Sequence, residues 1–220
     1  MGLPKILKKI LPESWVYNYE IKIQKNSMQN EMSLDEWEKK GKPMPPPSSL
    51  KKAMMLEHAK KYNATRFVET GTFLGDTSFF MKDYFYKVDT IELDIKLADK
   101  AVKRFESIEN VKVWQGDSGV VISELLKTIT NETIVFFYLD GHFSGGITAK
   151  ADSNTPISKE LELIFNHSKN HVIFIDDARL FFSNEVDYPP YEELVKQIKM
   201  YNPRAEVSVD LDIIKILPNT

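Results

Sequence analysis

The stretch that decides the fold is Glu69-Thr-Gly-Thr-Phe-Leu-Gly-Asp-Thr77. It follows a short apolar segment, residues 65–69, that is typical of a buried strand, and it precedes a helical pattern over residues 76–86. The two glycines let the backbone turn sharply and let a ligand approach it closely. Their Gly-x-x-x-Gly spacing differs from the Gly-x-Gly-x-x-Gly of dinucleotide-binding folds, which favours a ligand without a pyrophosphate. A plain glycine turn into a helix is the alternative interpretation.

Strand and helix patterns alternate along the chain from residue 49 onward. Helices of about ten residues between short apolar segments predict a parallel sheet with right-handed crossovers. The expected strands cover residues 65–69, 88–92, 111–114, 133–139, 171–175, 206–209 and 213–217. The expected helices cover residues 49–62, 76–86, 96–105, 119–128, 156–166 and 190–200.

The connection between the last two strands fixes their direction. Only residues 210–212 join them, which is too short for a parallel crossover, so this pair must be antiparallel. We therefore predict a doubly wound α/β domain with a mostly parallel seven-stranded sheet that ends in a C-terminal antiparallel hairpin.

Length and composition suit one such domain with a modest N-terminal extension. The chain has 220 residues, a formal net charge of −3 and no cysteine. This charge argues against nucleic acid as a partner. The absence of cysteine excludes disulfides and thiolate sites and fits a reducing compartment, so we expect a cytoplasmic protein. No apolar run approaches the roughly 18–20 residues that a membrane span needs.

The N-terminal extension, residues 1–48, differs in character from the domain at residues 49–220. It is rich in lysine and dotted with aromatic residues, and it ends in a proline-rich segment that favours an extended connector. We expect its start to form a short helix that docks on the domain or on the second subunit of a homodimer, with contact to a membrane surface as the alternative. The apolar face of that helix would be Leu3, Ile6, Leu7, Ile10 and Leu11.

In an open α/β sheet the ligand lies beyond the carboxyl ends of the strands, so the residues that follow each strand are candidates for a site. After the first strand, Glu69 suits an ammonium group better than a phosphate. After the second, Glu92 can accept hydrogen bonds from both hydroxyls of a ribose. A solvated surface acid is the alternative interpretation of Glu92, and Asp94 is the alternative residue for the ribose. After the third, Asp117 and Ser118 can contact an adenine amine or simply cap the next helix.

Three carboxylates follow the fourth and fifth strands, namely Asp140 and the pair Asp176-Asp177. Three acids that converge at one edge repel each other strongly unless something neutralises them. Either a cation such as Mg²⁺ or Ca²⁺ is shared among them, or Arg179 and lysines supply the positive charge.

Taken together, these residues resemble the class I S-adenosylmethionine-dependent methyltransferase superfamily over residues 50–217. The resemblance implies the class I methyltransferase fold and S-adenosylmethionine as the cofactor. The cofactor contacts that it implies are Glu69, Gly71, Thr72, Gly75, Thr77, Ser78, Glu92, Leu93, Asp117, Ser118 and Asp140.

Two finer resemblances concern the acceptor side. Asp140 followed by Asp176-Asp177 resembles the metal-dependent O-methyltransferases of the catechol, caffeoyl-CoA and macrolide-sugar type, which implies a metal on these three aspartates. Those families usually have Asp-Asn at the pair, so Asp177 makes this site more negative. Residues 139–150 and 155–161 also resemble an uncharacterised bacterial group associated with surface-polysaccharide gene clusters, which implies polysaccharide biosynthesis and a saccharide or other small-molecule acceptor.

A hydroxyl acceptor needs a base or a metal to lose its proton. We expect His142 to be that base or to orient the acceptor, with Lys150 as a charge partner for an acidic site or acceptor and residues 143–155 as a flexible lid. A histidine that caps a helix and an ordinary surface loop are the alternative interpretations. The other three histidines, His58, His167 and His171, are expected to be structural. The competing interpretations are a metal-independent methyltransferase, an inactive S-adenosylmethionine-binding module and a nucleotide-dependent oxidoreductase.

Overall fold

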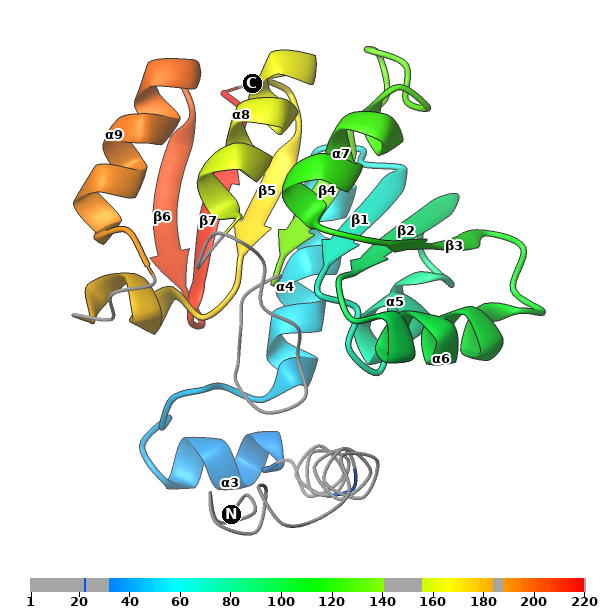
Figure 1. The fold of residues 1–220 in the computed structure, drawn as a ribbon. Helices are drawn as coiled ribbons and strands as arrows, with labels where there is room; N and C mark the ends of the chain where they lie inside the picture. Colours follow the sequence, from blue (N-terminus) through cyan, green and yellow to red (C-terminus); the bar gives the residue numbers. More distant parts are fainter. Residues whose placement is uncertain (1–21, 23–31, 141–155, 184–187, 220) are drawn as a thin grey trace, which may run out of the picture.

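A computed structural model describes residue 22 and residues 32–140, 156–183 and 188–219 of the chain (Figure 1). Its seven strands form one sheet in the order β3-β2-β1-β4-β5-β7-β6. The first five strands are parallel, and β7 runs antiparallel to both β5 and β6. The strands are β1 (Arg66–Thr70), β2 (Lys87–Glu92), β3 (Val111–Gln115), β4 (Val135–Leu139), β5 (Val172–Ile175), β6 (Glu206–Asp210) and β7 (Ile213–Leu217).

The predicted fold class is therefore confirmed, including the closing hairpin. Residues Leu211 and Asp212 form its two-residue turn, and both have positive φ angles of 48° and 62°. Turns with two positive φ values match the twist of the flanking strands, which explains how so short a connection reverses the chain.

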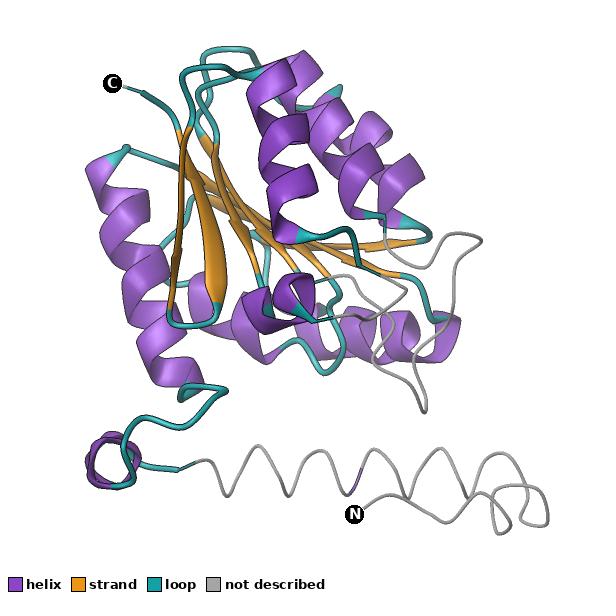
Figure 2. Ribbon diagram, turned by 90° about the vertical axis from the view of Figure 1, so that its left-hand side faces the viewer, coloured by secondary structure: helices purple, strands orange, loops and turns teal. Residues whose placement is uncertain are grey.

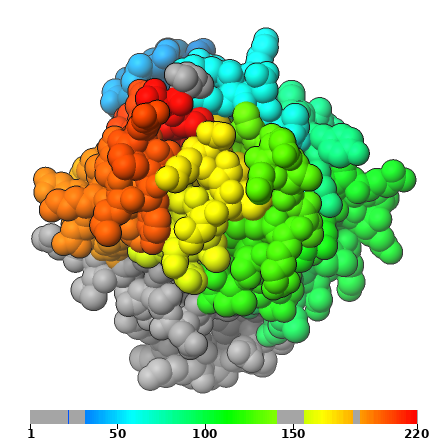
Figure 3. Space-filling model, turned by 90° about the horizontal axis from the view of Figure 1, so that it is seen from above, coloured from blue at the N-terminus to red at the C-terminus, as the bar shows by residue number. Residues whose placement is uncertain are grey.

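Helices cover both faces of the sheet (Figure 2). One apolar cluster lies between the sheet and α7, α8 and α9, and a second lies between the sheet and α4. Figure 3 shows α9, α8 and α7 side by side along one face of the molecule. The helices are α3 (Leu34–Lys39), α4 (Ser48–Lys61), α5 (Asp76–Met81), α6 (Ile95–Phe105), α7 (Ser118–Leu126), α8 (Ile157–His167) and α9 (Tyr191–Tyr201), with a 3₁₀ helix η1 (Ala178–Phe182) after β5.

Side chains that alternate along the central strands contribute to the two apolar clusters in turn. Val135, Phe137 and Leu139 of β4 point to the α7–α9 side, whereas Phe136 and Tyr138 point to the α4 side. Successive side chains of a strand project to opposite faces, so a strand covered on both sides is apolar throughout.

Helix α5 is shorter than its sequence pattern predicts, because it ends at Met81 and not at residue 86. The chain turns there so that Phe85 enters the core. Asn110, from the loop before β3, donates its side-chain amide to the carbonyls of Lys82 and Phe85 at 2.7 and 3.1 Å. These bonds satisfy carbonyls that a continued helix would have paired.

The N-terminal extension is described only in part, and the expected helix over residues 3–11 lies outside the described residues. Helix α3 begins with a capping box in which Ser33 and Glu36 satisfy each other's backbone amides. Its buried Trp37 donates from the indole nitrogen to the carbonyl of Pro43 at 2.7 Å, which fastens the proline-rich connector to the helix. None of the helices described is both long and apolar enough to span a membrane.

Two histidines form a chain of hydrogen bonds at the amino end of β5. His171 is buried, and its Nδ1 accepts the Val135 amide proton at 3.2 Å. Its Nε2 therefore carries the proton that bonds His167 Nδ1 at 2.9 Å, and His167 Nε2 in turn reaches the Ile129 carbonyl at 3.2 Å. Burial, followed by the neighbouring His167, lowers the pKa of His171 to about 3.

This pair of histidines predicts that the free energy of unfolding decreases in acid. The folded pKa of His171 lies below that of the unfolded chain, so protons favour unfolding and stability is lost as the pH falls below about 6.5. Between pH 7.5 and pH 5 the wild-type chain should lose about 2 kcal/mol more unfolding free energy than His171→Asn, whose side-chain oxygen can still accept from Val135. Urea unfolding at both pH values measures this, and equal losses in the two proteins would contradict it.

Candidate functional site

The candidate site lies at the carboxyl ends of the central parallel strands. Strand register aligns Thr70 of β1 with Leu139 of β4, and Leu139 with Ile175 of β5. The ladder continues one step further, because the amide of Asp140 donates to the Thr70 carbonyl and the amide of Asp176 donates to the Leu139 carbonyl, at 3.1 and 3.0 Å. The acids that follow β4 and β5 therefore emerge side by side.

The loop between β1 and α5 requires its glycines. Gly71 and Gly75 have φ angles of 84° and 77°, in the region that residues with a side chain rarely adopt. A Cβ atom on Gly75 would also lie 2.8 Å from the Phe105 ring. The Gly-x-x-x-Gly spacing thus serves a tight turn that packs against α6.

Beneath this loop lies a buried network around Glu69. Its carboxylate accepts from the hydroxyls of Ser78 and Thr90 at 2.6 and 2.9 Å, and Thr72 bonds Thr90 at 2.6 Å. Burial raises the pKa of Glu69 to about 7, against the opposing effect of the hydroxyls of Ser78, Thr90 and Thr77. Three of the predicted cofactor residues, Glu69, Thr72 and Ser78, are therefore bonded within a network that fixes the loop to β1 and β2.

Glu92, at the end of β2, holds the same loop from the side. One of its oxygens accepts the Phe73 amide proton at 2.7 Å, and the other accepts the Asp94 amide proton at 2.9 Å. Burial raises the pKa of Glu92. A carboxylate has about four acceptor positions, so both oxygens can still accept from a ligand's hydroxyls. The adjacent Leu93 uses its carbonyl to accept from Gln115 at 3.1 Å.

The acids after β2 and β3 act as helix caps. Asp94 accepts from the first amides of α6, and Asp117 accepts from the Gly119 amide at 2.8 Å at the start of α7, where Ser118 is the first residue. For Asp117 the capping alternative is the contact present in the structure, and its role toward an adenine stays a prediction.

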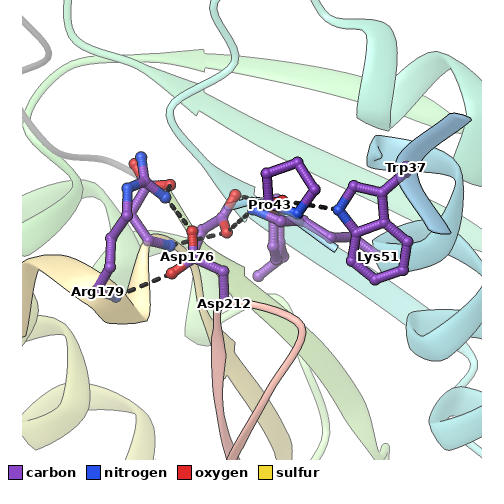
Figure 4. Close-up of polar contacts among 8 residues, drawn as sticks. Trp37, Pro43, Lys51, Asp176, Arg179 and Asp212 are labelled. Atoms are coloured by element: carbon purple, nitrogen blue, oxygen red, sulfur yellow. Dashed lines mark hydrogen bonds and ion pairs between the residues drawn. The ribbon is translucent and has the colours of Figure 1, made fainter. Parts of the chain in front are cut away.

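Asp176 accepts hydrogen bonds on both of its carboxylate oxygens (Figure 4). One oxygen accepts from the ammonium of Lys51, which belongs to α4, and from the Asp177 amide at 2.8 Å. The other oxygen accepts from the Tyr138 hydroxyl. Lys51, Tyr138 and Asp176 are all buried, so these charges and dipoles are satisfied within the protein.

A second ion-pair group lies on the other side of Asp176. Asp177 has a left-handed backbone with φ 54°, and its carboxylate lies 2.7 Å from the Arg179 guanidinium. Arg179 also pairs with Asp212 from the β6–β7 turn, which accepts the Arg179 amide proton at 2.9 Å. Asp212 is 2% exposed, so the hairpin turn brings a fourth acid to this edge of the sheet.

These contacts test whether a divalent ion fits the three aspartates. Asp176 and Asp177 are each paired with a cation of the chain, and across the described residues no three acids or histidines are arranged around a common metal position. Burial raises the pKa of Asp140 well above its usual range, and the nearby Asp176 and Asp177 add to this shift. The aspartates therefore do not fit a metal as they stand. Neutralisation by Arg179 and a lysine, the second sequence expectation, is the arrangement present.

The expected base His142, its partner Lys150 and the expected lid at residues 143–155 lie outside the described residues. His58 lies on α4, where its Nδ1 bonds the Met54 carbonyl at 2.9 Å and its ring meets the edge of Phe174. These contacts place His58 in the packing between α4 and the sheet.

Comparisons with known proteins agree with the fold. No protein-family model and no curated protein matches the chain. Among solved structures, the O-methyltransferase TomG from Streptomyces achromogenes, involved in tomaymycin synthesis, superposes with a TM-score of 0.55 at 17% identity over 84% of this chain and 86% of its own. An O-methyltransferase from Bacillus cereus gives 0.55 at 18% identity over 80% and 84%. The methyltransferase PaMTH1 from Podospora anserina gives 0.52 at 16% identity over 90% and 94%. The chain thus has the class I methyltransferase fold.

The raised pKa of Glu69 predicts that the free energy of unfolding depends on pH. The folded pKa of Glu69 lies above that of the unfolded chain, so its contribution to stability is present below about pH 4.5 and is lost as the pH rises through 7. Glu69→Gln keeps an acceptor for Ser78 and Thr90. From pH 5 to pH 8, the difference in unfolding free energy between this variant and wild type should change by about 2 kcal/mol in favour of the variant. Urea unfolding at the two pH values measures this. The exposed Glu124→Gln serves as the control, and a Glu69→Gln effect that is independent of pH would refute the prediction.

Proposed function

We propose that this protein is an S-adenosylmethionine-dependent methyltransferase that methylates a hydroxyl of a small molecule, with a sugar as the favoured acceptor. The observation that carries the proposal is the glycine loop at the carboxyl end of β1, held by Glu92 from the end of β2. This arrangement presents acidic acceptors and tight backbone, and it suits a ligand that bears hydroxyls and positive charge rather than phosphate. The solved O-methyltransferases of the same fold support the proposal.

The candidate residues fall into two groups, one that would bind the methyl donor and one that would act on the acceptor. On the donor side, Glu69, Gly71, Gly75 and Glu92 would hold S-adenosylmethionine, which when bound supplies an electrophilic methyl group on a sulfonium. On the acceptor side, a substrate hydroxyl would receive that methyl group, and the electron pair of the carbon–sulfur bond would remain on sulfur. The hydroxyl proton leaves to a base, for which His142 is our candidate. The protein's contribution is mainly alignment of donor and acceptor.

Of the two variants of this function, the ion pairs favour the metal-independent one. Lys51 and Arg179 already neutralise Asp176 and Asp177, which would otherwise be the ligands of a shared cation. Proton removal then depends on the base alone.

The ribose-binding role of Glu92 can be tested without an acceptor. Glu92→Gln keeps one oxygen for the Phe73 amide and loses the charge and half of the acceptor capacity. It should raise the Kd for S-adenosylhomocysteine at least about tenfold, which corresponds to about 1.4 kcal/mol. Asp94→Asn, which conserves the cap of α6, is the matched control and should bind as wild type does. Calorimetry measures both, and an unchanged Kd in Glu92→Gln would exclude this role.

The acceptor-side role of Asp140 needs an acceptor, to be found by transfer of a radiolabelled methyl group onto a panel of sugars and phenols. With that acceptor, Asp140→Ala should lower turnover at least about 100-fold, as expected when a group that orients a proton transfer is lost. The affinity for S-adenosylhomocysteine should stay within about threefold of wild type. Full turnover in Asp140→Ala would show that this carboxyl takes no part in the reaction.

A further inference from the structure

Lys51 occupies a position that its own helix does not favour. It lies in the first turns of α4, close to the amino end, where the helix macrodipole is positive and a cation is destabilising. The first turn of α4 holds no acidic residue that would compensate for this charge. Lys51 is also only 7% exposed, which is rare for a lysine. Something outside the helix must therefore stabilise the ammonium.

The compensation comes from the carboxyl edge of the sheet. The Lys51 ammonium pairs with Asp176, and Asp177 and Asp140 add attractive charge from further away. A buried ion pair is stable only when the remaining hydrogen-bonding capacity is also met. That condition is fulfilled at Asp176, which also accepts from the Tyr138 hydroxyl and the Asp177 amide.

Two cations from different elements enclose this group of acids. Figure 4 shows Asp176 between Lys51, which comes from α4, and Arg179, which comes from η1. Arg179 neutralises Asp177 and Asp212, whereas Lys51 meets Asp176. The Lys51 ammonium therefore lies at the Asp176 carboxylate, close enough to Asp177 and Asp140 for both to attract it.

Building on the proposed methyl transfer, we infer that the Lys51 ammonium replaces a divalent cation at this site. Lys51 is a positioning residue that fixes the Asp176 carboxylate and offsets the charge of the neighbouring aspartates. A single positive charge on a flexible stem supplies no Lewis acid, so it orders the site and leaves activation of the acceptor to a base. Removal of the ammonium should expose the carboxylates and create a metal site that the natural protein lacks.

Mn²⁺ binding, followed by electron paramagnetic resonance of the free ion, tests this inference in the full chain. The proteins to compare are wild type, Lys51→Ala, Lys52→Ala, Asp176→Asn and the double variant Lys51→Ala with Asp176→Asn. Lys52 is the matched control, because it is the next residue, carries the same charge and lies over the Phe80 ring instead of the aspartates. Circular dichroism verifies that each variant is folded, and calorimetry with S-adenosylhomocysteine is run on the same samples.

We expect Lys51→Ala to bind Mn²⁺ at least about tenfold more tightly than wild type and Lys52→Ala, and the double variant to lose this gain. Wild-type Mn²⁺ binding as tight as that of Lys51→Ala, and abolished by Asp176→Asn, would overturn the inference. A folded Lys51→Ala protein without the gain would overturn it as well. Should Lys51→Ala not fold, wild type against Asp176→Asn decides, since Mn²⁺ binding that depends on Asp176 contradicts the inference and equally weak binding supports it.

The same samples separate this inference from the proposed function. If wild type failed to bind S-adenosylhomocysteine, the methyltransferase proposal would fall, whatever the Mn²⁺ result. If wild type bound it and Mn²⁺ occupied the aspartates, only the role of Lys51 would fall.

Discussion

A parallel sheet collects at one edge whatever residues follow its strands, and in this protein those residues are mostly acids. The Asp176 carboxylate is buried, so its negative charge needs a partner within the protein. The Lys51 ammonium of α4 is this partner, and it joins the first helix of the domain to the end of β5. Register between β1, β4 and β5 then determines which other groups lie near this pair.

The donor side of the site rests on a different use of acid. Glu69 lies beneath the glycine loop and Glu92 lies beside it, and both accept hydrogen bonds that hold the loop in its tight turn. Burial of Glu69 raises its pKa and therefore costs free energy when the carboxyl is ionised, and the hydrogen bonds that it accepts fix this loop. The loop is consequently preorganised, which is what the proposed methyl transfer would require of the surface that binds the donor.

Much of the fold could be predicted from the sequence, because alternating apolar segments and a three-residue connection leave few arrangements of the last strands. The end of α5 could not, since it depends on Asn110, which lies 28 residues after Lys82. Arg179 was expected to neutralise the site acids, but the identity of the lysine and the participation of Asp212 were missed for the same reason. Lys51 and Asp176 are 125 residues apart, and Asp212 reaches Arg179 only through the hairpin turn. The local sign of such a pairing was a lysine near the start of a helix whose first turn holds no acidic residue.

The charges of the assembled site also restrict which donors and acceptors fit it. The carboxylates of Asp176, Asp177 and Asp212 outnumber the two cations, Lys51 and Arg179, so acid is in excess among the described residues here even without Asp140, whose pKa is raised by burial. An excess of acid attracts a cationic donor such as a sulfonium and repels phosphate. This is a stronger argument against a dinucleotide or a phosphorylated acceptor than the spacing of the glycines, because it follows from the charged groups that a ligand would have to approach.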